Sequence, residues 1–482
     1  MKNHTYKIIL SFIALILSCS SCKKFVEIPP PSTQLVPGNV FNNNSSATGA
    51  LTAIYTQMMI NQESFFMSSF NGILSDEMTN YSTDPGEVQL YTNAMSATQT
   101  PAPGPWTNAY NYIYQCNAII EGLEKTTGVS NSVKQQLIGE SEFTRAFWHF
   151  YLTNIYGDVP LVLTTDYKAN ATISRTPRLQ VLQQVISDLK NSYNLLNPNY
   201  IDASDTTITT EKVRPNKGAA AALLARAYLY LGNYSNDAAN FTIAESQASL
   251  VLNNSNLYSL CSDLNKVFLP NSTEAIWQLA IPLPASNGNA ATPDGASFIL
   301  IAEPGTAGVS VTLSPQLLNT FETGDNRKID WVGSFAGSTT TYYFPYKYKV
   351  QNSSDVSEYE MVIRLGELYL IRAEARTQLG NISGALSDLN TIRLRAGLGN
   401  YNGATDKTSL LSAILHERQV ELFSEWGHRW FDLIRTGNVN SVMNVVTPVK
   451  GGTWGSNGQQ TLYPIPQSEI NKDSKLSQNP GY

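Results

Sequence analysis

The sequence has little of what metal or nucleophilic chemistry needs. Only four of its 482 residues are histidine. The pair His416 and Glu417 lacks the second histidine of an H-E-x-x-H zinc helix, because position 420 is Val420. No G-x-x-x-x-G-K-[ST], G-x-G-x-x-G or G-x-S-x-G motif occurs. We therefore expect no phosphate-binding loop, no nucleophile elbow, no cofactor and no bound metal.

The chain also lacks a basic surface and a second long apolar run. Lysine and arginine total 32 against 38 acidic residues, which gives a net charge of -6 and no basic cluster. This balance does not favour nucleic acid as a partner. Beyond the first residues, no segment reaches the roughly 18 uninterrupted apolar residues of a membrane-spanning helix. A content of 42% hydrophobic and 15% charged residues is typical of a globular protein.

The first 40 residues indicate export and anchoring. Lys2 and Lys7 precede an apolar run at 8–17 that is too short to span a bilayer. Residues 1–22 are predicted to be a lipoprotein signal peptide, with either Cys19 or Cys22 as the lipidated residue. The prolines of 29–31 favour extended backbone, so 23–40 is predicted to be a tether between the lipid and the folded part.

Helix-period apolar faces dominate the rest of the chain. The predicted helices are 50–59, 106–123, 133–156, 181–195, 217–231, 237–252, 361–379, 383–395 and 409–433. Strand patterns are few, at 274–281 and 341–350. The expected fold is mostly α, a helical fold with embedded tetratricopeptide-like helix hairpins, long loops and minor β structure.

Two of these hairpins share a sequence signature. Segment 361–398 predicts two helices joined at Gly380 and Asn381, with Ser383 as the N-cap of the second helix and Gly397 at its end. The same Leu-Gly-Asn sequence recurs at Leu231, Gly232 and Asn233 after an alanine-rich helix. The offset of 379 − 231 = 148 residues is no simple multiple of a 34-residue repeat, so the repeats are predicted to be interrupted.

Two long segments, 70–105 and 282–357, lack helical periodicity and are rich in small and polar residues. Segments of this length in a compact domain are usually binding loops or disorder, and their aromatic content favours binding loops. Cys116 and Cys261 lie elsewhere, each beside apolar residues. We expect them to be buried free thiols rather than a disulfide.

Aromatic and polar side chains in the two segments are the ligand-binding candidates. A sugar has apolar C–H faces and a rim of hydroxyls, so its site needs exposed rings beside hydrogen-bonding groups. The candidates are Asp76, Asn80, Tyr81 and Tyr91 in the first segment, and Arg327, Trp331, Tyr342 and Tyr343 in the second. Trp331 and Tyr81 are the preferred ones. For 342–350, a β-hairpin strand whose alternate aromatics are buried is the competing interpretation.

Carboxylates could instead indicate a glycoside hydrolase. Asp76 with Glu77 is one candidate pair, and Glu421 with Glu425 is another. Glu417, Glu421 and Glu425 follow helical i, i+4 spacing, which favours ion pairs on a packed helix. Trp106, Trp148, Trp277 and Trp430 fall in apolar periodic runs and are predicted to be core residues.

Several segments together resemble the SusD/RagB family of Bacteroidetes surface lipoproteins. They lie in family order over nearly the whole mature chain. These segments are 22–25, 146–151, 157–161, 217–219, 231–233, 364–375, 417–422, 427–433, 463–466 and 478–482.

The resemblance implies a non-catalytic nutrient-binding protein, anchored through lipid to the outer membrane and facing the cell exterior. Its partner would be a SusC-like TonB-dependent transporter, to which it delivers an oligosaccharide. A peptide ligand is the alternative within the family. The resemblance also implies a SusD-like N-terminal part, 41–235, and a C-terminal part, 236–482, that form one compact unit. It provides no ligand-binding residues.

Overall fold

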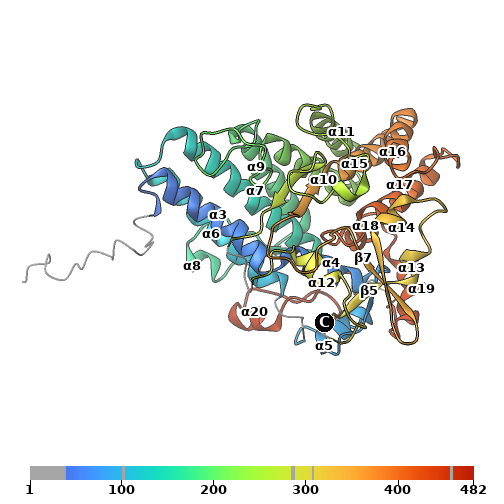
Figure 1. Cartoon of the computed structure of the whole chain (residues 1–482). Coiled ribbons are helices and arrows are strands. Elements are labelled where there is room, and N and C mark those ends of the chain that lie inside the picture. Colours follow the sequence, from blue (N-terminus) through green and yellow to red (C-terminus); the bar gives the residue numbers. More distant parts are fainter. Residues whose placement is uncertain (1–39, 100–103, 284–287, 307–308, 456–459) are drawn as a thin grey trace, which may run out of the picture.

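The computed structural model describes residues 40–99, 104–283, 288–306, 309–455 and 460–482 (Figure 1). Helices account for 53% of the structure and strands for 7%, so the expectation of a mostly helical fold is confirmed. The predicted signal peptide, both candidate lipidation cysteines and the tether up to residue 39 lie outside the described residues. No helix within the described ranges is long and apolar enough to cross a membrane.

Long helices form a continuous array in which neighbours pack against each other in the order α6, α7, α9, α10, α11, α15, with α16 and α17 on α15. In Figure 1 the helices from α7 to α16 run across the upper part of the molecule, and α6 lies lower on the left beside α3. The helices of the array are α6 (Pro105–Lys125), α7 (Asn131–Tyr156), α9 (Arg178–Leu195), α10 (Lys217–Ser235), α11 (Ala238–Leu252), α15 (Leu365–Gln378), α16 (Ile382–Arg395) and α17 (Lys407–Leu422). Helices α3 (Asn44–Ile60) and α4 (Glu63–Leu74) pack against its first members.

The two sequence-related hairpins are direct neighbours in space. Helix α11 of the first packs against α15 of the second, although 112 residues (253–364) separate them in the chain. The repeats are interrupted in the sequence, as predicted, but their helices stack directly on each other in the structure. The predicted division at residue 235 falls between α10 and α11, which pack tightly on each other, and it stays a prediction.

The predicted turn at Gly232 is wrong. Helix α10 continues to Ser235, and the chain turns at Asn236, whose φ of 57° is left-handed. Gly232 lies inside the helix, where the close packing of the Phe241 ring requires glycine, because a Cβ would come within 2.7 Å of that ring. The turn at Gly380 is confirmed by its φ of 80°, which favours glycine.

Three predicted helix boundaries also need correction. The segment 360–364 forms strand β8 (Glu360–Arg364), so α15 begins later than predicted. The N-cap of α16 is Asn381 rather than Ser383, because the Asn381 carboxamide accepts from the Gly384 backbone N–H at 3.1 Å. The predicted helix 409–433 is two helices, α17 and α18 (His428–Arg435), since Trp426 and Gly427 adopt positive φ between them.

The two predicted loop segments contain short elements and pair with each other. Strand β1 (Met78–Asn80) of the first runs antiparallel to β5 (Val311–Leu313) of the second. The predicted strands are observed as β4 (Ala275–Leu279), which pairs with β8, and β7 (Thr341–Pro345), which forms a hairpin with β6 (Val332–Ala336). The remaining elements are α5 (Pro85–Tyr91), β2 (Val159–Pro160), α8 (Tyr167–Asn170), β3 (Arg175–Thr176), η2 (Leu264–Lys266), α12 (Pro293–Phe298), α13 (Pro315–Leu318), α14 (Asn326–Asp330), α19 (Val439–Val449) and α20 (Gln467–Lys472).

The predicted core residues are confirmed. All four tryptophans assigned to the core are buried: Trp106, Trp148, Trp277 and Trp430. Cys116 and Cys261 are free thiols, as expected, but only Cys116 is buried, and Cys261 is partly exposed. Burial raises the pKa of Cys116 to about 12, which keeps this thiol protonated.

Buried arginines and carboxylates join the array to the strand region. Arg364, between β8 and α15, donates to Glu425 at 2.7 Å and to Glu421 at 2.5 Å. On the other side, Arg327 of α14 pairs with Glu421 at 3.0 Å and Glu417 at 2.7 Å. The prediction that the α17 carboxylates make ion pairs is therefore confirmed.

Candidate ligand-binding site

The two predicted loop segments enclose a cavity of about 530 Å³, here called the tyrosine cavity. It lies where β1, β5 and β7 meet α13 and α14, on the lower right in Figure 1. This size is within the range of small-molecule sites, about 300–1,000 Å³. The cavity is lined by Thr79, Tyr81, Thr312, Leu313, Pro315, Leu318, Asn319, Lys328, Thr340, Thr341, Tyr342 and Tyr343.

Three of the predicted tyrosines come together here. The rings of Tyr81 and Tyr342 meet edge to face, with centroids 5.8 Å apart and planes at 84°. Tyr343, the next residue on β7, is 40% exposed, whereas Phe344 after it is buried. The predicted strand is thus present, but Tyr342 and Tyr343 both line the cavity rather than alternating into the core.

Backbone pairing fixes the position of Tyr81. Its N–H donates to the carbonyl of Ser310 at 2.7 Å, which extends the β1–β5 pairing by one residue. Asn80 shapes the turn that follows, because its carboxamide oxygen accepts from the Ser82 N–H at 3.0 Å. Asn80 is therefore a turn-forming residue beside the cavity and is not part of its lining.

Tyr91 supports the cavity from behind β1. It is half-buried at the end of α5. Burial raises its pKa and the nearby Tyr81 adds to this effect, while a hydrogen bond with Thr79 acts in the opposite direction without cancelling it. The Lys450 ammonium lies 5.2 Å from its ring centroid. Tyr91 thus contacts residues of the lining but does not line the cavity itself.

The polar part of the lining was missed from the sequence. Asn319 follows α13, and Lys328 on α14 donates to the Leu318 carbonyl at 3.1 Å. With Thr79, Thr312 and the threonines at the start of β7, they place amide, ammonium and hydroxyl groups beside the tyrosine rings. No sequence signal marks Asn319 or Lys328 as binding residues. They share a cavity with Tyr81 only because β1 pairs with the distant strand β5.

Trp331 and Arg327 do not serve as exposed ligand contacts, and this corrects the sequence-based prediction. Trp331 is fully buried, its indole N–H donates to the Leu264 carbonyl at 3.1 Å, and the Lys347 ammonium lies 4.9 Å from its ring. Arg327 is also fully buried and is held by Asp325 at 2.9 Å. The tertiary structure instead pairs Arg327 with the α17 glutamates and packs Trp331 on Phe268.

Asp76 is likewise a buried structural residue. The Arg429 guanidinium of α18 donates two hydrogen bonds to the Asp76 carboxylate, at 2.8 and 2.7 Å. Burial alone would raise the pKa of Asp76, but the charge and hydrogen bonds of Arg429 outweigh it and the pKa is lowered. Its neighbour Glu77 responds in the opposite direction, since burial and then the charge of Asp76 raise its pKa to about 8.

These positions disfavour the hydrolase interpretation. Asp76 and Glu77 are both buried, and neither belongs to the lining of the tyrosine cavity. Glu421 and Glu425 are neutralised by arginine and lysine. No candidate carboxylate pair therefore faces a ligand in the tyrosine cavity.

One group of described residues has metal-ligand geometry. Ligand atoms of Glu322, His416 and Glu417 lie within 4.8 Å of one another. Their capacity is already used, because Arg393 pairs with Glu322 at 2.5 Å and with Glu417 at 3.3 Å. The Nε2 atom of His416 also lies 2.9 Å from the Thr320 carbonyl. Ion pairing accounts for this group without a metal.

Comparison with known families decides the classification. A model described as the SusD family matches residues 332–482, and a model described as starch-binding and associating with the outer membrane matches residues 25–229. The chain belongs to the SusD/RagB family. Members of this family are non-catalytic binding proteins, and the expectation that the chain is not an enzyme is confirmed on that basis.

Relatives that match over nearly their whole length support this assignment. A SusD-like protein of Formosa agariphila is 24% identical over 537 residues, which covers 96% of each chain. A SusD superfamily structure from Bacteroides vulgatus has a TM-score of 0.77 at 22% identity, over 91% of this chain and 99% of the other. A solved laminarin-binding SusD-like protein has a TM-score of 0.73 at 22% identity, over 91% and 100%. At these identities the solved structures establish the fold.

Proposed function

We propose that the protein is a cell-surface glycan-binding lipoprotein that captures an oligosaccharide in the tyrosine cavity and delivers it to a TonB-dependent outer-membrane transporter. The observation that carries the proposal is the pairing of Tyr81 with Tyr342 in a cavity that combines hydroxyl, amide and ammonium groups with apolar surface. The mechanism is binding alone.

The chemistry of the lining matches a sugar. Aromatic rings cover the apolar C–H faces of a pyranose, and an edge-to-face pair presents two differently oriented surfaces to successive units of a chain. Thr340, Thr341 and Asn319 are exposed in the lining and supply donors and acceptors for ring hydroxyls. Lys328 adds a donor at the cavity wall.

The comparisons support glycan as the ligand class. One matching family model is described as starch-binding, and one structure with the same fold binds laminarin. A lipid on Cys19 or Cys22, followed by the tether, anchors the protein to the outer membrane in this proposal. The described helices include no membrane span. The transporter partner comes from the family resemblance.

Isothermal titration calorimetry on the mature chain tests the proposal, with starch, laminarin and a broader glycan panel as ligands. We expect Tyr342→Ala to raise the Kd of the bound glycan about 5- to 30-fold, since one aromatic contact contributes about 1–2 kcal/mol. Tyr81→Ala should act in the same direction. Tyr167→Ala is the matched control, because Tyr167 is 73% exposed and lies on α8, away from the cavity lining.

Two results would overturn the proposal. If a glycan binds and Tyr342→Ala, Tyr81→Ala and Tyr167→Ala all leave its Kd unchanged, the site lies elsewhere. If no glycan of the panel binds but a peptide panel does, and Tyr342→Ala weakens the peptide, the ligand class is peptide.

A further inference from the structure

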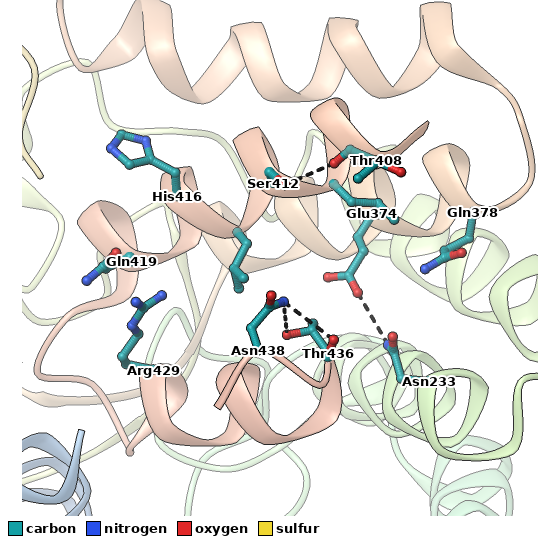
Figure 2. A pocket seen from close by; sticks show the side chains of 12 residues that line it. Asn233, Glu374, Gln378, Thr408, Ser412, His416, Gln419, Arg429, Thr436 and Asn438 are labelled. Atoms are coloured by element: carbon teal, nitrogen blue, oxygen red, sulfur yellow. Dashed lines mark hydrogen bonds between the residues drawn. The ribbon is translucent and has the colours of Figure 1, made fainter. Parts of the chain in front are cut away.

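A second cavity, of about 390 Å³, lies between the array and α18 (Figure 2). Helix α17 forms one wall and α18 with the residues that follow it forms the other, while α15 and the end of α10 close one end. We call it the amide cavity. It is lined by Asn233, Glu374, Gln378, Thr408, Leu411, Ser412, Leu415, His416, Gln419, Arg429, Thr436 and Asn438.

The amide cavity contains no uncompensated charge on its inner wall. Glu374 is only 4% exposed, and Arg435 holds both of its carboxylate oxygens, at 2.5 and 2.8 Å. Arg429 is held in the same way by Asp76. Because each inner charge already has an opposite charge in contact, an ion entering the cavity would lose hydration without gaining a partner. The inner wall therefore favours a neutral ligand.

Uncommitted hydrogen-bonding groups converge on the cavity. Gln419 is 6% exposed and its Nε2 donates to Asp76 at 3.2 Å, which leaves its carbonyl oxygen without a partner among the described residues. Arg429 uses Nε and Nη2 for Asp76, and within the same part of the chain its Nη1 has no partner. The side-chain amide of Gln378 also has no partner in the described ranges.

These groups lie at both ends of the cavity. Figure 2 shows Gln419 and Arg429 at one end and Gln378, with Glu374 and Asn233, at the other. Leu411 and Leu415 lie on α17 within the lining and offer an apolar strip. A neutral molecule with hydroxyls at both ends and an apolar face between them would satisfy this arrangement.

We propose that the amide cavity is a second binding site, for a short neutral saccharide of one or two units. Hydroxyls both donate and accept, which matches a lining of carboxamides and hydroxyls. A free short peptide fits less well, because it carries two terminal charges and the inner wall has no unpaired charge for either. The proposal extends the proposed function but does not depend on what occupies the tyrosine cavity.

The two cavities share structural elements. Gln419 of the amide cavity holds Asp76, three residues before Thr79 of the tyrosine cavity. His416 of the amide cavity contacts the Thr320 carbonyl, next to Asn319. Occupancy of the amide cavity would therefore stabilise two segments that form the wall of the tyrosine cavity.

The test is saturation-transfer NMR on the mature chain. The neutral probes are glucose, galactose, mannose, maltose and cellobiose, and glucuronate is the charged probe. Ser412→Phe is designed to fill the cavity, because Ser412 is an exposed residue of its lining. Ser387→Phe is the matched control, since Ser387 is an exposed serine on α16 and is not in the lining.

We expect at least one neutral probe to bind, glucuronate to bind more weakly, and Ser412→Phe to lower the affinity at least tenfold while Ser387→Phe does not. The Tyr81→Ala, Tyr342→Ala double variant should retain this binding, which separates the amide cavity from the tyrosine cavity. If Ser412→Phe lowers the melting temperature, Gln378→Ala is used instead to test binding in the amide cavity. It removes an amide without an internal partner, and should weaken binding about three- to tenfold.

The proposal is wrong if no neutral probe binds, or if Ser412→Phe and Ser387→Phe behave alike. It is also wrong if the double tyrosine variant abolishes all saccharide binding, because then only the tyrosine cavity binds sugar. Loss of glycan binding in that variant with retained binding of the small probe would instead confirm two sites.

Discussion

The helical array and the strand region use aromatic residues differently. In the array, large rings such as Trp148 and Tyr151 lie on one helix and pack into the core. In the strand region, Trp331 is fully buried, whereas Tyr343, twelve residues later, is 40% exposed on the cavity wall. Helical periodicity tells where an aromatic residue of the array will lie, but in the strand region only the tertiary pairing decides it.

Charged residues follow the same division. On α17 the glutamates at i, i+4 spacing face buried arginines, and a helical face predicts this arrangement. Their partners Arg327 and Arg364 come from a loop helix and a strand end, which no local pattern connects to α17. The sequence therefore predicts that the α17 glutamates form ion pairs, but it does not predict which arginines are their partners.

The largest expected effect on stability comes from replacing a buried aromatic residue of the strand region, Trp331, rather than the exposed Tyr343. Trp331→Ala removes a buried indole that packs on Phe268 at 5.8 Å between centroids. We expect the free energy of unfolding to fall by about 3–5 kcal/mol, measured by chemical denaturation. A loss of glycan binding without a loss of stability would restore Trp331 as a ligand contact.

A slightly smaller effect is expected in the array. Leu368 on α15 is fully buried, so Leu368→Ala should lower the free energy of unfolding by about 2–5 kcal/mol. The cavities are not lined by this residue, and glycan preference should stay the same in calorimetry. An unchanged melting temperature would contradict the role of Leu368 in the core.

A pH-dependent effect distinguishes two neighbouring carboxyls. The pKa of Glu77 is about 8 in the folded protein, compared with an ordinary glutamate pKa of 4.5. Between these two pH values the folded state keeps a proton that the unfolded chain has lost. The free energy of unfolding therefore falls as the pH rises through this window. Glu77→Gln should raise stability by about 1–3 kcal/mol at pH 8 and have little effect at pH 4.5.

Asp76→Asn is the contrasting variant. The pKa of Asp76 is lowered in the folded protein, so its ion pair stabilises the fold above the ordinary value of 3.8 and loses this contribution as the pH falls. Denaturation at pH 7 should show that Asp76→Asn destabilises the protein. If both variants shift stability in the same direction at neutral pH, the assignment of opposite pKa shifts is wrong.

The smallest effect on stability is expected at the cavity wall. Tyr343→Ala removes an exposed ring, and we expect the free energy of unfolding to change by less than about 0.5 kcal/mol. Thermal and chemical denaturation should therefore leave it close to the unsubstituted protein. A cost similar to that of Trp331→Ala would show that β7 needs Tyr343 for packing.

The sequence by itself determined the helical framework. Apolar residues three or four positions apart specify a helix and its buried face locally, which is why α6, α7 and α9 and their core residues agree with prediction. Errors occurred where the local signal is ambiguous: the sequence Leu-Gly-Asn lies inside α10 at 231–233 but follows the end of α15 at 379–381.

Only the tertiary structure decided the composition of the sites. Tyr81 and Tyr342 are 261 residues apart and meet because β1 pairs with β5, and β5 in turn packs beside β7. Residues such as Asn319 and Gln419 carry no local signal, since an amide is equally suited to a surface, a cap or a cavity. Whether such a side chain faces a ligand depends on which distant segment covers its neighbours, and that is a property of long-range packing.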